Sequence, residues 1–196
     1  MKKNFLHQSL CNVLILSLLM YLAGCAHLES KTQNINIAPR KAVTACGYSN
    51  FLKGSYAELH GNDEEALAAY TIVEKCDPET DMVDDRIPLV LLKIGKREEA
   101  IDYLKKKIIN KPDSIIQRLI LARLYIQEKQ YDIAIKLYNE VLELSPERND
   151  VYLRLATIYS EQKKYEHAKK ILYQIIEKDP DFYLAHLHLA RLYSLT

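Results

Sequence analysis

Apolar residues recur with a helical period along much of this chain. In the stretch YDIAIKLYNEVLEL, residues 131–144, they take positions i, i+1, i+4, i+5, i+8 and i+9, namely Ile133, Ala134, Leu137, Tyr138, Val141 and Leu142. The stretch VYLRLATIYSEQ, residues 151–162, has a second set, which is Tyr152, Leu155, Ala156 and Tyr159. Each set forms one stripe on a helix of 3.6 residues per turn, so the pattern predicts two amphipathic helices.

Three sets of residues recur with a spacing of 34. They are Pro78, Pro112, Pro146 and Pro180; Ala66, Ala100, Ala134 and Ala168; and Tyr70, Leu104, Tyr138 and Leu172. This period resembles that of the tetratricopeptide repeat family. The resemblance implies an all-α, right-handed α-solenoid of helix-turn-helix repeats, at 47–80, 81–114, 115–148 and 149–182. Residues 183–196 repeat the first-helix pattern once more, as an unpaired helix of a fifth, incomplete repeat.

Two departures from a regular array stand out. Pro88 falls inside the expected first helix of the second repeat, where a proline either kinks the helix or marks a late start, and we favour the late start. The last helix is apolar around its whole circumference, which favours a truncated longer array over a helix that docks on a partner. Expected helix caps are Ser114, Asn149 and Asp150 for first helices and Asn62 for a second helix.

The N-terminus has the pattern of a secretory signal. Lys2 and Lys3 precede an uncharged apolar run that is too short for a comfortable membrane span. Residues 22–25, Leu-Ala-Gly-Cys, resemble the bacterial lipobox, which implies removal of residues 1–24 and a lipid on Cys25. An uncleaved signal anchor is the alternative. Residues 25–44 then form a polar tether, and Ala26 after the cysteine implies the outer membrane, facing the periplasm.

Cys46 and Cys76 would lie at adjacent ends of one antiparallel helix pair. An exported protein meets oxidising conditions, so we expect a disulfide between them, with two free thiols as the alternative. Two cysteines make a zinc site improbable, and His186 and His188 are expected to be surface residues of a helix rather than ligands. Loss of Lys2 and Lys3 leaves 25 basic against 26 acidic groups, a net charge of about −1, which argues against nucleic acid as a partner.

The sequence contains no recognisable catalytic constellation, phosphate-binding loop or metal motif, so we expect no enzyme activity, no cofactor and no small-molecule substrate. The family resemblance implies a protein or peptide segment as ligand, bound in a groove lined by first helices. The expected groove residues are Phe51, Leu119, Arg123, Leu153, Leu187 and Arg191.

The leading hypothesis is a lipid-anchored scaffold for a cell-envelope machine, such as one for pilus assembly, secretion, outer-membrane biogenesis or polysaccharide export. An accessory array of a larger protein with a catalytic or effector part is the alternative, and a carrier of an apolar small molecule is a third.

Overall fold

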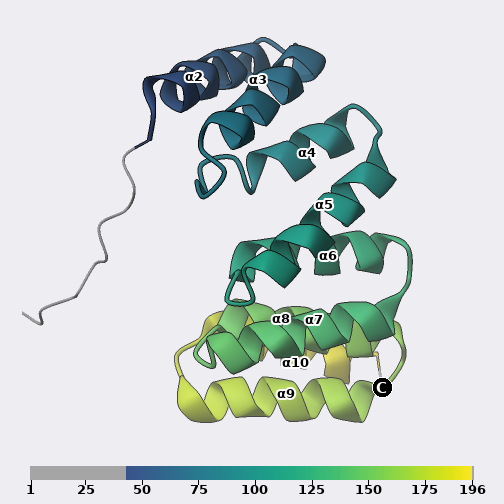
Figure 1. Ribbon diagram of the computed structural model, residues 1–196. Coiled ribbons are helices and arrows are strands. Elements are labelled where there is room, and N and C mark those ends of the chain that lie inside the picture. The colour runs from purple at the N-terminus through teal and green to yellow at the C-terminus, as the bar shows by residue number, and fades with distance from the viewer. Residues whose placement is uncertain (1–42, 196) are drawn as a thin grey trace, which may run out of the picture. The chain divides into compact units, whose positions relative to one another are not determined.

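The computed structural model describes residues 43–195, which form one compact unit. The expected signal segment, Cys25 and all but the last two residues of the expected tether lie outside these residues. Within them the chain forms nine helices and no strand (Figure 1). The helices are α2 (Ala45–Leu59), α3 (Asp63–Cys76), α4 (Arg86–Lys93), α5 (Arg97–Asn110), α6 (Ile115–Gln127), α7 (Tyr131–Leu144), α8 (Asn149–Glu161), α9 (Tyr165–Lys178) and α10 (Tyr183–Tyr193).

Each helix packs against the helix before it and the helix after it. The second helices α3, α5, α7 and α9 begin at residues 63, 97, 131 and 165, which are 34 residues apart. The first helices α2, α4, α6 and α8 end with the same spacing, at residues 59, 93, 127 and 161. The predicted all-α solenoid is therefore confirmed.

The turns inside the helix pairs also follow the period of 34. The residue after each first-helix C-cap has a left-handed backbone, at Gly61 (φ 74°), Gly95 (φ 80°), Lys129 (φ 59°) and Lys163 (φ 60°). In each turn the next N–H donates to a carbonyl five residues back, as from Asn62 to Ala57 at 2.9 Å. This arrangement is the Schellman motif, which ends a helix and is usually built on glycine.

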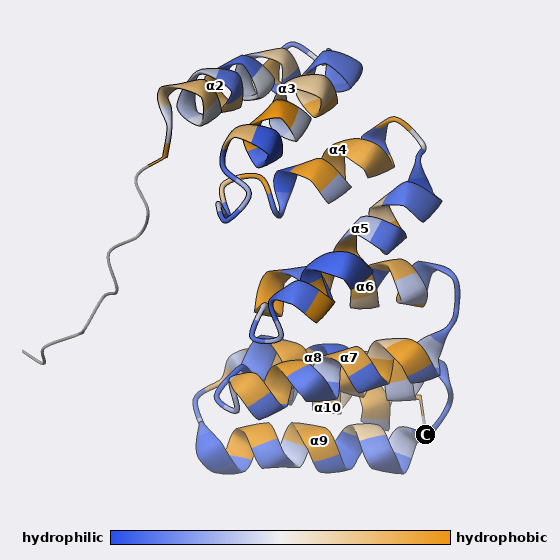
Figure 2. Cartoon of the chain, in the orientation of Figure 1, coloured by the Kyte–Doolittle hydropathy of each residue, from blue (hydrophilic) through white to orange (hydrophobic). Residues whose placement is uncertain are grey.

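The core runs through the stack as three clusters of buried side chains. The alanine and the large residue that recur every 34 positions are all fully buried, from Ala66 and Tyr70 to Ala168 and Leu172. Gly54 is buried against the Tyr70 ring, and a Cβ at residue 54 would overlap that ring. Hydrophobic and hydrophilic residues alternate along the helices (Figure 2), because each helix packs against its neighbours through part of its circumference and presents the rest to solvent.

Helix α4 breaks the period, because it begins at Arg86 and has only eight residues. The preference for a late start is thus confirmed, although the helix begins two residues before Pro88 rather than at it. Pro88 lies in the first turn, where a helix leaves its N–H groups without intrahelical acceptors and a missing N–H costs little.

The turn that precedes α4 buries a carboxylate. Asp84 is buried and forms ion pairs with Lys107 and with Lys111, the latter at 2.8 Å. Lys107 takes the position that Val73 and Val141 fill in neighbouring repeats. It also pairs with Glu74 at 2.8 Å, so at this position an ionic bridge between α3, α5 and the turn before α4 takes the place of an apolar side chain. Burial alone would lower the pKa of Lys107, but its bonds to Asp84 and Glu74 raise it overall.

Of the four expected caps, Asn149 and Asp150 were wrong, whereas Ser114 and Asn62 hold the predicted positions. Asn149 and Asp150 lie inside α8, whose N-cap is Arg148, and Asp150 instead accepts two hydrogen bonds from that guanidinium at 2.8 and 3.0 Å. Ser114 and Asn62 occupy N-cap positions, but neither side chain forms a capping hydrogen bond. Among the helices of residues 43–195, a side chain caps the N-terminus of α2 alone, where Thr44 accepts from the Gly47 N–H.

Candidate protein-binding surface

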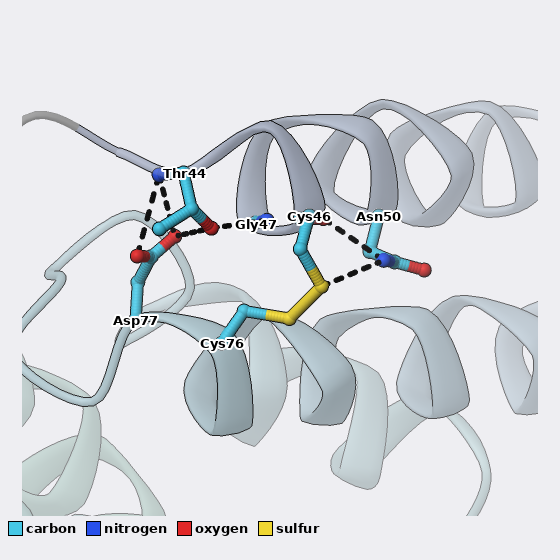
Figure 3. The surroundings of a disulfide bond; sticks show 6 residues. All are labelled: Thr44, Cys46, Gly47, Asn50, Cys76 and Asp77. Atoms are coloured by element: carbon cyan, nitrogen blue, oxygen red, sulfur yellow. Dashed lines mark hydrogen bonds between the residues drawn. A yellow bond between two sulfur atoms is a disulfide. The ribbon is translucent and has the colours of Figure 1, made fainter.

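The first helix pair is closed at one end by a disulfide and a hydrogen-bonded clasp (Figure 3). Cys46 in the first turn of α2 is joined to Cys76, the last residue of α3, with 6.1 Å between their Cα atoms. Beside it the Asp77 carboxylate accepts hydrogen bonds from the N–H of Thr44 at 3.1 Å and from its hydroxyl at 3.0 Å. A Cβ at Gly47 would overlap this carboxylate, so the close approach requires glycine. Thr44, expected to end the tether, is therefore part of the helical unit.

Two of the expected groove residues line one concavity. Arg123 of α6 and Leu153 of α8 face a hollow of about 420 Å³, which helix α10 also borders through His188. Its other lining residues are Ile126, Asp150, Arg154, Thr157, Ile158 and Glu161. The hollow thus combines apolar side chains with two guanidinium groups, and it is formed by consecutive first helices.

Arg191 lies in a smaller hollow of about 180 Å³ next to the first. The two hollows share Thr157, Glu161 and His188, so they form one continuous surface over α8 and α10. Within residues 43–195 neither Arg123 nor Arg191 forms an ion pair, and both side chains are exposed. Their charges are therefore accessible to a ligand from solvent.

The structure places the other expected groove residues elsewhere. Phe51 packs against the buried Tyr70, with 6.0 Å between ring centroids, and belongs to the first core cluster. Leu119 packs against the central core cluster, so both are half-buried packing residues. Leu187 is exposed on α10 and lines neither hollow. The six residues thus do not form a single strip.

Arg154 and His188 line this surface but were not among the expected groove residues. The six expected residues take the fifth or ninth position of their repeats, whereas Arg154 and His188 take the sixth. The sixth position lies three residues before the ninth, hence on the same side of a helix. A helical wheel of the first helices would therefore have included both residues.

The arginines also affect the core behind the surface. Tyr138 is buried beneath α8, and burial raises the pKa of its hydroxyl above the ordinary value. The positive charges of Arg154 and Arg123 oppose this increase without cancelling it. Asp150 keeps its negative charge to low pH, because hydrogen bonds from Arg148 hold its pKa below the ordinary range.

A third hollow, of about 430 Å³, lies between α2 and α4 and contains Ser55, Glu58, Leu59, Arg86 and Lys93. The Glu58 carboxylate accepts hydrogen bonds from Lys93 at 2.8 Å and from the Tyr70 hydroxyl at 3.0 Å. Burial alone would raise the pKa of Glu58, but these bonds and the charges of Lys93 and Arg86 hold it below the ordinary value. Here the cations are largely neutralised, unlike those over α8 and α10.

The part of the chain from Val43 to Leu195 holds no group of three or more His, Cys, Asp or Glu side chains placed to bind a metal ion. None of its helices combines the length and the apolar character needed to cross a bilayer.

Comparisons with known proteins agree with this architecture. The family model described as Tetratricopeptide repeat matches residues 125–192. No curated protein sequence matches the chain. Among solved structures, the crystal structure of MamA protein is 21% identical with a TM-score of 0.62, over 76% of this chain and 81% of that one. MamA from Desulfovibrio magneticus RS-1 is 17% identical with a TM-score of 0.63, over 77% and 85% of the two chains.

A tetratricopeptide repeat protein from Parabacteroides merdae ATCC 43184 is 16% identical with a TM-score of 0.65, over 77% of this chain and 61% of that one. These likenesses concern the fold.

Proposed function

Because the chain is a tetratricopeptide repeat protein, we propose that it is a scaffold that binds another protein on the surface over α6, α8 and α10. The observation that carries this proposal is the continuous hollow surface, in which apolar side chains lie beside the unpaired Arg123 and Arg191. An apolar surface with a few placed polar groups is the usual composition of a binding site.

The surface favours a particular kind of ligand. Leu153 and Ile126 offer apolar contacts in the hollow, and the guanidinium of Arg123 offers five N–H donors for carboxylates. The carboxylate of Asp150 accepts two hydrogen bonds from Arg148 and also attracts Arg154, whereas Arg123 has no ion pair among residues 43–195. The ligand that fits is an amphipathic protein segment with apolar residues along one side and acidic residues at its edge.

We further propose that the scaffold is lipid-anchored at Cys25, on the periplasmic side of an outer membrane, and that it assists the assembly of a cell-envelope machine. The lipobox-like sequence of residues 22–25 and Ala26 support this placement. A disulfide in the helical unit is also the expected state of a protein in an oxidising compartment.

Site-specific photocrosslinking in cells tests the binding surface. A photoreactive amino acid at Thr157, in the centre of the surface, should capture a partner protein, whereas the same group at Lys136 on α7 should not. The charge reversal Arg123→Glu should weaken this capture, and Lys136→Glu is the matched control. Equal capture from both positions, or capture unaffected by Arg123→Glu, would exclude this surface as the binding site.

The anchor has a separate test. Globomycin, which blocks the lipoprotein signal peptidase, should make an uncleaved precursor accumulate, and Cys25→Ser should release the protein from membranes. Normal processing in the presence of globomycin would refute lipidation at Cys25 and would leave the binding surface unaffected.

A further inference from the structure

Helix α2 exposes a stripe of large apolar side chains. Tyr48, Leu52, Tyr56 and Leu59 follow at i, i+4, i+8 and i+11, which places them on one side of the helix. Their exposed fractions are 56%, 50%, 65% and 84%. The opposite side of α2, with Gly47, Gly54 and Ala57, is buried against α3. Helix α2 is therefore apolar on two opposite sides, and one of them has no cover among residues 43–195.

The repeat explains why this stripe is uncovered. The residues that correspond to Tyr56 in the next four first helices are Val90, Leu124, Ile158 and Leu192, and all four are buried. Each lies on a helix that packs against the second helix of the preceding repeat. Helix α2 has no such predecessor in the described part of the chain. A terminal repeat usually has a polar outer face, whereas this one carries tyrosine and leucine.

The charges around α2 differ from those of the rest of the protein. Between Ala26 and Ala57 the sequence has four basic residues, Lys31, Arg40, Lys41 and Lys53, and one acidic residue, Glu29. The remainder of the mature chain, residues 58–196, then has 21 basic and 25 acidic groups. Glu58, the single acidic residue of α2, is engaged by Lys93 and Tyr70. The stripe therefore lies in a basic segment without a free carboxylate on its helix.

We propose that the Tyr48–Leu59 stripe of α2 rests on the phospholipid surface that holds the lipid anchor. This inference builds on the anchor at Cys25 proposed above. Thr44 comes 19 residues after Cys25, and a random-coil chain of that length has a root-mean-square span of about 25 Å, so α2 is the described helix nearest to the anchor along the chain. Tyrosine and leucine on one face, flanked by basic residues, are the side chains of helices that lie in the membrane interface.

The contact fixes the orientation of the array. A lipid chain on Cys25 attaches the protein at a single point, about which the helical unit could rotate. A second contact through α2 would hold the first repeat against the headgroups. The membrane surface and the protein-binding surface would then lie at different repeats and remain usable together.

Tryptophan fluorescence tests this proposal without background, because the chain contains no tryptophan. Tyr56→Trp places a reporter on the stripe, and Tyr183→Trp places a control on α10, where Tyr183 is equally exposed. Each full-length protein is purified with its lipid from membranes. It is then reconstituted into vesicles of phosphatidylethanolamine and phosphatidylglycerol, with and without brominated phospholipid.

We expect the emission of the reporter at position 56 to shift to the blue on vesicles and to be quenched by the brominated lipid. The reporter at position 183 should show neither change. Adding Leu52→Glu and Leu59→Glu should reduce the quenching at position 56 to the level at position 183. Circular dichroism checks that these variants at exposed positions remain folded.

The other outcomes separate the two proposals. If the protein floats with vesicles but position 56 is not quenched, the anchor stands and the membrane contact of α2 is wrong. If it does not float, the anchor fails and the inference fails with it. A blue-shifted emission from the tryptophan at position 56, in the unlipidated Cys25→Ser protein without vesicles, would show that residues 26–42 or a second copy of the protein cover the stripe. Sedimentation distinguishes those two cases, and either of them overturns the proposal.

Discussion

The two halves of the helical stack are held together by different means. In the second half, α6 to α9, the helices begin and end with the 34-residue period, and the core is mostly apolar or aromatic, with Gln117 and Arg118 of α6 as its buried polar residues. In the first half, α2 to α5, one helix is short, Lys107 takes a core position, and a disulfide and a buried ionic bridge tie the helices to each other.

This difference shows how far a repeat can depart from its pattern. The family model matches residues 125–192, which lie mostly in the regular half. The first half keeps the same helix ends and turns, because Gly61 and Gly95 hold the same positions as Lys129 and Lys163. In the first half, the disulfide between α2 and α3 and the ionic bridge between α3, α5 and the turn before α4 add specific links to the apolar packing.

The largest expected effect comes from breaking the ionic bridge. Asp84→Ala leaves Lys107 with Glu74 alone and Lys111 without its buried acceptor, and removal of one partner of a buried ion pair costs up to about 3–5 kcal/mol. Urea unfolding measures the loss, with Asp85→Ala as the control at the neighbouring position. Equal stability of the two variants would show that the bridge is not needed. In the double variant Asp84→Ala, Lys107→Val, apolar packing should recover part of the loss.

Reduction of the disulfide should have the next largest effect. Closing a loop of 30 residues by Cys46–Cys76 contributes about 3–4 kcal/mol on the chain-entropy model. Hydrogen exchange after reduction, or in Cys46→Ser, Cys76→Ser, should become faster in α2 and α3. Exchange in α8 and α9 should change little, because stability in such stacks is a sum of neighbour terms. If hydrogen exchange became faster by the same factor in all helices, the effect of the disulfide would not be local.

Substitutions in the turns should change the free energy of unfolding by less, and the sign should differ between the two halves. Lys129→Gly and Lys163→Gly should each raise the free energy of unfolding by about 0.5–1 kcal/mol, because a side chain disfavours the left-handed backbone. Gly61→Lys and Gly95→Lys should lower it by a similar amount. Thermal unfolding measures all four variants, and destabilisation by Lys129→Gly would mean that the lysine side chain contributes an interaction of its own.

The smallest effect concerns pH. The pKa of Glu58 in the folded protein lies below its ordinary value of 4.5, so its contribution to stability is fully present above pH 4.5 and is lost as the pH falls through the folded pKa. The difference in stability between the parent and Glu58→Gln should therefore shrink on acidification below pH 4.5. A difference that stays constant down to pH 3 would argue against the charged network around Glu58.

Much of the fold follows from the sequence because a repeat presents the same evidence several times. Ala66, Ala100, Ala134 and Ala168 individually mean little, but together they give the period and the helix pairs. Pro88 indicates the short α4, since a proline is compatible with only a few helix positions.

The candidate surface was harder to predict. Whether Phe51 or Leu119 faces a groove or a core depends on how neighbouring helices cross, and this is not encoded in the spacing within a single helix. The burial of Asp84 likewise depends on two lysines that lie 23 and 27 residues further along the chain. The left-handed Lys129 and Lys163 carry no local signal either, because glycine is the usual residue there.

The disulfide also determines how the protein carries a mechanical load. A pull on the chain from its N-terminal side enters the helical unit at Thr44 and reaches Cys46 two residues later. From there the covalent link carries the force directly to Cys76, so the thirty-residue α2–α3 hairpin is bypassed and cannot be drawn out. In the oxidised protein the first element to bear the force is the segment after Cys76, where the Asp84 bridge joins the loop to α5. Reduction would move the point of yielding to α2 and so convert a stiff attachment into an extensible one.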